Sequence, residues 1–347
     1  MISRWSAPPE QRWSTSAERR GVLMSGAQHV SLGVEGAVLH GQESQVRFSI
    51  GGREPWQCEL ADLLVLGLGV VDGALRSLRA CFIQAKRGKS ATKTSGARFD
   101  IKEDQLALLR SFPEFEGVVG VYKGIKCKFR NRSGMLGAYG LLSAPGEFTV
   151  LSARLLGQIL GGRKTLTEKE LTPAIVAESA SYRSKSRGER SGWFPWDLDP
   201  EHCPACREMW RHFVPFPWHD FRDHHRHFGP HVGHGNAGLA GTDGSVLSCL
   251  SIDEFVDAWS SLRLGEPWSS GVASENSRGM FAAIASAVSR MAAAADGLKH
   301  TLDLLTTAAR NEDVALELPN EAPEGRMAVI AATVSVTRGE GEKPVEG

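Results

Sequence analysis

The chain has 347 residues, of which 41% are apolar, and 40 basic residues balance 40 acidic ones, so the formal net charge is zero. This length allows two domains with sizeable cores, and zero net charge excludes binding to a polyanion through bulk charge. Six cysteines are too few for a disulfide framework, and no apolar run approaches the roughly 20 residues of a membrane helix. We therefore expect a reduced, soluble, cytoplasmic protein with no membrane partner.

The predicted elements of the N-terminal part begin after a polar arm. Residues 1–22 are predicted to be a flexible arm, and residues 31–40 a short helix that carries Glu35. Residues 45–50 alternate like a strand.

Two long apolar runs follow and predict a β-hairpin. They cover residues 58–71 and 75–86, and Asp72-Gly73 between them is a strong turn signal. Residues 101–112 have apolar side chains at helical spacing, with Asp100 as the expected N-cap.

The second half of the chain is predicted to be mainly helical. In the first half, shorter strands are also expected at 118–122 and within 149–160, where a helix follows the strand. The later predicted elements are helices at 166–181, 252–262 and 274–311, the last one broken near Gly297, and a strand at 327–337.

Polar side chains at one end of the predicted hairpin suggest a reactive site. Gln84 and Lys86 are two residues apart on a strand and therefore point to the same side, and Asp62 lies in the preceding strand. A buried acid, amide and ammonium are costly unless something uses them, and a divalent metal beside a phosphodiester would do so. Asp62 and Gln84 would hold Mg²⁺ or Mn²⁺, with Glu35 as a further carboxylate ligand. Lys86 would hold the attacking water or neutralise the pentacovalent phosphate.

Two other interpretations of these residues remain open. Asp62 and Lys86 would also fit a purely structural ion pair. Glu59 competes with Asp62 for the ligand role, since the two acids face opposite sides of a regular strand unless a bulge brings both into the site.

The order of these residues resembles a known superfamily. Glu35, then Asp62, a hairpin and Gln84-Ala85-Lys86 are similar to the motif of the PD-(D/E)XK, or restriction-endonuclease-like, nucleases. The Gln variant resembles the Mrr-type branch and nuclease domains of phage-defence proteins, over residues 29–160. The resemblance implies a mixed sheet flanked by helices and magnesium-dependent phosphodiester hydrolysis. Gln84 in place of an acid removes one negative charge, which weakens metal affinity and also suits a non-cleaving domain.

Two basic segments flank the predicted site. Residues 79–98 contain six basic residues and no acid, and residues 123–132 contain five and no acid. Such segments favour binding to nucleic acid phosphates, although an ordinary solvated loop has the same composition. The expected nucleic-acid contacts are Arg87, Lys89, Lys93, Lys126, Lys128 and Arg130.

A His- and Cys-rich segment covers residues 192–244. It contains Cys203 and Cys206 at the spacing of a zinc knuckle, and His212 and His219 are among the candidates for two further ligands. The alternative is a His-rich loop with two free thiols.

The sequence thus predicts an α/β (α+β) protein with two parts. Residues 23–165 would form a restriction-endonuclease-like nuclease domain, and residues 166–340 an α-rich C-terminal module. The expected function is that of a metal-dependent DNA endonuclease in bacterial genome or phage defence, acting as a homo-oligomer or with a defence-system partner protein. The alternatives are a non-catalytic DNA-binding or assembly protein on the same fold, and a zinc-organised interaction module.

Overall fold

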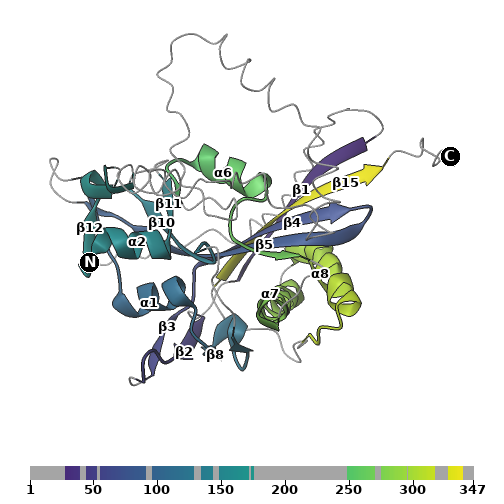
Figure 1. The fold of residues 1–347 in the computed structure, drawn as a ribbon, viewed down its shortest axis with the longest axis horizontal. Coiled ribbons are helices and arrows are strands. Elements are labelled where there is room, and N and C mark those ends of the chain that lie inside the picture. Colours follow the sequence, from purple (N-terminus) through teal and green to yellow (C-terminus); the bar gives the residue numbers. More distant parts are fainter. Residues whose placement is uncertain are drawn as a thin grey trace, which may run out of the picture.

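A large mixed sheet with helices on both faces forms the centre of the molecule (Figure 1), which is a mixed α/β fold. The structure is a computed structural model. It describes residues 28–39, 44–52, 55–90, 96–128, 134–143, 148–171, 173–175, 248–269, 275–294, 296–316 and 327–338.

The helices are α1 (Glu103–Ser111), α2 (Ala153–Leu160), α6 (Ile252–Ser260), α7 (Glu275–Ala294) and α8 (Lys299–Asn311), with 3₁₀ turns η1 (Gly120–Tyr122) and η2 (Asp296–Leu298). Residues 168–171 and 173–175 are also helical. The strands are β1 (Gln28–Leu39), β2 (Gln45–Phe48), β3 (Trp56–Glu59), β4 (Leu63–Val71), β5 (Ala74–Arg87), β6 (Lys89–Ser90), β7 (Ala97–Asp100), β8 (Phe115–Val119), β9 (Lys126–Cys127), β10 (Gly137–Leu142), β11 (Phe148–Ser152), β12 (Thr165–Thr167), β13 (Ser248–Cys249), β14 (Glu266–Ser269) and β15 (Met327–Arg338).

The large sheet joins strands from both ends of the chain. Its order is β1-β15-β4-β5-β10-β11-β13, and β14 also pairs with β5. β15 is antiparallel to β1 and parallel to β4, and β10 is parallel to β5. Two smaller sheets, β12-β7-β6 and β3-β2-β8-β9, lie beside it.

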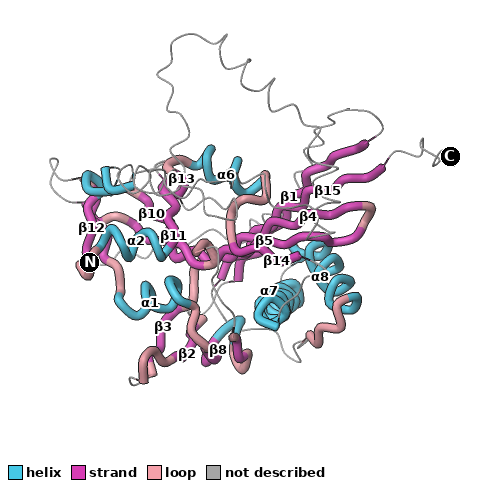
Figure 2. The backbone as a smooth tube through the Cα atoms, in the orientation of Figure 1, coloured by secondary structure: helices cyan, strands magenta, loops and turns pink. Residues whose placement is uncertain are grey.

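Both faces of the large sheet are covered, which explains the continuous apolar sequence of β4. Leu64, Leu66 and Leu68 point to the face that packs against α1, α2, α7 and α8, whereas Val65 points to the face covered by α6. Figure 2 shows α6 on the opposite side of the sheet from α7 and α8. Gln84 and Lys86 continue the alternation of Phe82, so their side chains lie on the α1 side.

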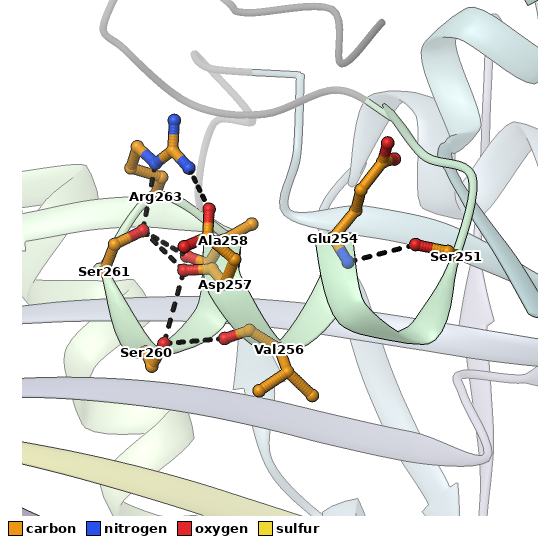
Figure 3. Close-up of polar contacts among 8 residues, drawn as sticks. All are labelled: Ser251, Glu254, Val256, Asp257, Ala258, Ser260, Ser261 and Arg263. Atoms are coloured by element: carbon orange, nitrogen blue, oxygen red, sulfur yellow. Dashed lines mark hydrogen bonds and ion pairs between the residues drawn. The ribbon is translucent and has the colours of Figure 1, made fainter. Parts of the chain in front are cut away.

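The helix α6 is fixed locally by its first and last turns (Figure 3). The Ser251 hydroxyl accepts from the Glu254 N–H at 3.1 Å. The Glu254 carboxylate in turn accepts from the Leu250 N–H at 2.7 Å. At the other end, Arg263 donates to the Asp257 carboxylate at 2.6 Å. These contacts define where α6 begins and ends on the sheet.

The hairpin prediction is confirmed, and the reason is local. Asp72 (φ 50°) and Gly73 (φ 78°) both have positive φ, the backbone that a two-residue hairpin turn requires. The helices predicted at 252–262 and 274–311, the break near Gly297 and the last strand are also present.

Three predictions, concerning the segments that carry Glu35, Asp62 and Asp100, are wrong. Residues 31–40 do not form a helix, because β1 runs through Glu35 and pairs with β15 along its whole length. Residues 58–71 form two strands in different sheets, β3 and β4, separated by a bend at Asp62. Asp100 does not cap α1; Lys102 holds that position, and Asp100 instead binds basic side chains.

The expected division near residue 165 does not separate two sheets. β13, β14 and β15 come from the second half of the chain, and all three belong to the large sheet. β15 even lies between β1 and β4. The residues that carry the predicted site therefore share one sheet, and one core, with the C-terminal strands and helices. None of the described helices is long and apolar enough to cross a membrane.

Candidate functional site

Asp62 lies in the bend between β3 and β4, where its backbone is bound to two neighbouring strands. Its N–H donates to the Ile83 carbonyl at 3.1 Å, and its carbonyl accepts from the Ala328 N–H at 3.0 Å. Ile83 directly precedes Gln84 on β5. These bonds therefore hold the half-buried Asp62 side chain beside the end of β5.

One oxygen of the Asp62 carboxylate makes the contacts with β5. Oδ2 accepts from the Ala85 N–H at 2.7 Å and from the side-chain amide of Gln84. Oδ1 has no hydrogen-bond partner among the described residues. Lys86 follows on the same face of β5, so the structure brings Asp62, Gln84 and Lys86 together at one end of the hairpin.

Gln105 on α1 is a member of this group that the sequence interpretation missed. Its amide nitrogen donates to Gln84 Oε1 at 3.1 Å, and its own oxygen accepts from Lys86 Nζ at 2.8 Å. Gln84 and Gln105 are 3% and 2% exposed, so each hydrogen bond matters for the stability of the site. A signal for Gln105 was present: it occupies the first position of the apolar helical stripe that continues with Leu108, Leu109 and Phe112.

Burial and the neighbouring acids have opposite effects on the pKa of Lys86. Burial lowers the pKa of the Lys86 ammonium below its usual range, and the Asp62 carboxylate opposes that shift. Glu59 and Asp104 also raise this pKa, whereas Lys102 lowers it. Lys86 thus lies among acidic and basic groups from β3, the bend that follows β3, and the start of α1, which is a polar setting for a half-buried lysine.

The donor set fits a magnesium ion in part. Mg²⁺ commonly binds through one or two carboxylates and keeps water and substrate phosphate as its other ligands. Asp62 Oδ1 fits this role. The described residues, however, contain no group of three His, Cys, Asp or Glu side chains that could hold a metal. Gln84 does not fit in its present orientation, because its amide nitrogen rather than its oxygen faces Asp62.

Comparisons with known proteins do not assign the chain to a family. No family model, curated protein or solved structure matches it. Function therefore has to be inferred from the geometry of Asp62, Gln84, Lys86 and Gln105.

Glu35, on β1, lies away from this group, and its carboxylate binds the first turn of α8. Its carboxylate accepts from the His300 N–H at 3.1 Å, the Thr301 N–H at 2.7 Å and the Thr301 hydroxyl at 2.6 Å. The β1-β15-β4 register places Glu35 level with Leu66. It is thus about 13 Å along the strands and about 10 Å across the sheet from Asp62. The structure does not bring Glu35 to the other predicted ligands.

These contacts predict a structural role for Glu35. Glu35→Ala should lower the free energy of unfolding by about 2 kcal/mol, because α8 loses an anion and three hydrogen bonds at its N-terminus. Denaturant unfolding measures the change, and Glu114→Ala, at an exposed loop acid, serves as the control with little expected effect. Unchanged stability together with weaker Mg²⁺ binding would instead place Glu35 at the metal.

The predicted basic face is interrupted by acids that lie outside the two basic segments. Lys89 Nζ lies 2.6 Å from Asp100, and Lys126 is the cross-strand partner of Glu116. Arg87 and Lys128 are exposed. The segments that are free of acids in the sequence are therefore not free of acids in space. Among these four residues, Arg87 lies nearest in sequence to Lys86.

Several predicted residues lie outside the described part of the chain. These are the zinc candidates and two of the basic contacts, namely Cys203, Cys206, His212, His219, Lys93 and Arg130, together with the arm at residues 1–22. The structure does not test them.

Proposed function

We propose that this chain is a metal-dependent endonuclease that hydrolyses DNA phosphodiester bonds on a restriction-endonuclease-like fold. The observation that carries the proposal is the convergence of Asp62, Gln84 and Lys86 at one end of the β4–β5 hairpin. A carboxylate, an amide and an ammonium at one place are the groups that a metal and a phosphate require.

The local topology supports the fold part of the proposal. The antiparallel pair β4–β5 is followed by α1 and then by β10, which is parallel to β5. This is a mixed sheet with a helix packed beside it, as the sequence resemblance implies. A role in genome or phage defence rests on that resemblance alone.

Each residue of the group has a distinct part in the proposed reaction. Asp62 Oδ1 would hold Mg²⁺, which supplies Lewis-acid polarisation of the phosphoryl group and an acidified water when bound. The Lys86 ammonium would stabilise the negative charge that develops on the phosphate. Arg87 is exposed at the next position and would bind a neighbouring phosphate of the DNA.

A non-catalytic DNA-binding or assembly protein is the second candidate. The observation that favours it is the hydrogen bond from the Gln84 amide to Asp62, which satisfies Oδ2 of the carboxylate without a metal. In this interpretation Asp62, Gln84, Gln105 and Lys86 form a structural network, and the surface near Arg87 binds DNA without cutting it.

Plasmid nicking distinguishes the two candidates. With Mg²⁺ or Mn²⁺ we expect wild-type protein to nick supercoiled DNA, and Asp62→Ala and Lys86→Ala to bind DNA without nicking it. Lys164→Ala is a matched control, since this exposed lysine pairs with Glu103 at 3.8 Å and should nick like wild type. Retained DNA binding without nicking by any form, wild type included, would favour the non-catalytic candidate.

A further inference from the structure

The hydrogen bonds of the site form a chain that runs from Asp62 through Gln84 and Gln105 to Lys86. Its two ends have fixed chemistry, because an ionised carboxylate only accepts and an ammonium only donates. Each amide between them can present either its NH₂ or its oxygen to a neighbour. Only one arrangement gives every contact a donor and an acceptor: Gln84 nitrogen to Asp62, Gln105 nitrogen to Gln84, and Lys86 to Gln105 oxygen.

The direction of this chain opposes metal binding through Gln84. Mg²⁺ takes oxygen ligands, whereas Gln84 turns its nitrogen toward Asp62. A half-turn of the Gln84 amide would exchange nitrogen and oxygen with little other movement. Asp62 Oδ2 would still accept from the Ala85 N–H at 2.7 Å, so this end of the chain tolerates the change.

The half-turn has consequences at the Lys86 end of the hydrogen-bond chain. Gln84 would then present its NH₂ to the NH₂ of Gln105, and both side chains are buried, so a lost hydrogen bond there is costly. Gln105 can restore that bond by turning as well. Its NH₂ then faces Lys86 Nζ, and two donors cannot bond, so Lys86 must leave Gln105.

We propose that Gln105 is a positioning residue that holds Gln84 with its oxygen turned away from Asp62, so that Mg²⁺ binding turns both amides and releases Lys86. This inference rests on the metal site of the proposed function. Lys86 would then be released toward the substrate phosphate only when a metal is bound. In the absence of metal, Lys86 is retained by Gln105.

Substitutions at Gln105 test the inference through Mg²⁺ affinity, measured by calorimetry on the full chain without DNA. Gln105→Met keeps the length of the side chain but removes both hydrogen bonds, so we expect about fivefold tighter binding. In Gln105→Glu the new carboxylate accepts from both Gln84 and Lys86. Gln84 then turns its NH₂ toward the new carboxylate and its oxygen toward Asp62 before any metal binds. For this variant we expect about tenfold tighter binding.

A charge control and a spectroscopic readout accompany these variants. Lys102→Met changes the net charge by the same amount as Gln105→Glu and leaves the chain of hydrogen bonds intact, so its effect should be smaller. In wild type, Mg²⁺ should shift the side-chain amide NMR signals of both Gln84 and Gln105 with one dissociation constant. In Lys102→Met the two signals should still shift together.

The outcomes separate this inference from the proposed function. Mg²⁺ affinity that is unchanged or weaker in both Gln105 variants, while Asp62→Asn loses binding, would overturn the orientation role and leave the metal site standing. Equal Mg²⁺ binding by Asp62→Asn and wild type would overturn the metal site and this inference with it. A purely structural Gln105 predicts lower thermal stability in both variants with no gain in affinity.

Discussion

A fragment that ends at residue 165 should not fold, although it contains Asp62, Gln84, Gln105 and Lys86. The fragment lacks β15, which is the partner of β1 and the parallel neighbour of β4. It also lacks α7 and α8, which cover Leu64, Leu66 and Leu68. Exposing one such leucine costs about 2 kcal/mol, and a whole domain has only about 5–15 kcal/mol of stability.

Circular dichroism and thermal unfolding of the fragment measure this effect. We expect no cooperative transition for residues 1–165 alone. Mixing with a separately produced fragment of residues 166–347 should restore it, because the second fragment supplies β15 and the covering helices. A cooperative, native-like transition of the first fragment alone would contradict the single sheet described above.

Lys86→Met should lower the single-turnover rate of DNA cleavage by about 1,000-fold while DNA affinity changes little. The methionine retains an unbranched side chain, one atom shorter, but removes the ammonium that donates to Gln105. A preorganised charge beside the scissile phosphate acts mainly in the transition state, so the rate should fall far more than the binding.

Quench-flow kinetics at saturating protein give the rate, and fluorescence anisotropy gives the affinity for the same duplex. Lys164→Met, which removes an exposed lysine with 76% of its side chain accessible, should cleave like wild type. A Lys86→Met rate within threefold of wild type would show that Lys86 has no part in the chemistry.

Elements with local signals were predictable from the sequence. Asp72-Gly73 carries its own turn chemistry, and the apolar spacing of 252–262 and 274–311 suffices to predict α6, α7 and α8. The convergence of Asp62 with Gln84 and Lys86 also follows from the hairpin, because an antiparallel turn brings the start of one strand to the end of the next.

Elements that depend on distant partners were not predictable. Residues 28–39 pair with residues 327–338, about 300 positions later, and nothing local indicates that partner. The strand itself has a local signal that the helix prediction missed, because Val30, Leu32 and Val34 alternate with Ser31, Gly33 and Glu35. β10 was missed because its two glycines weaken the strand pattern. Gly137 is required by packing, since a Cβ there would lie 2.3 Å from the Leu109 carbonyl oxygen of α1. The metal role predicted for Glu35 is wrong for a similar reason. Its hydrogen-bond partners, at the start of α8, are remote in sequence.

The most direct test of the proposed activity is the cleavage of a labelled DNA duplex by wild-type protein in Mg²⁺, compared with EDTA and with Asp62→Asn in Mg²⁺. We expect hydrolysis only by wild type with Mg²⁺, because Asp62 is the carboxylate that would hold the ion. Equal cleavage by Asp62→Asn, or no cleavage by wild type under any metal condition while DNA is bound, would contradict a metal-dependent nuclease at this site.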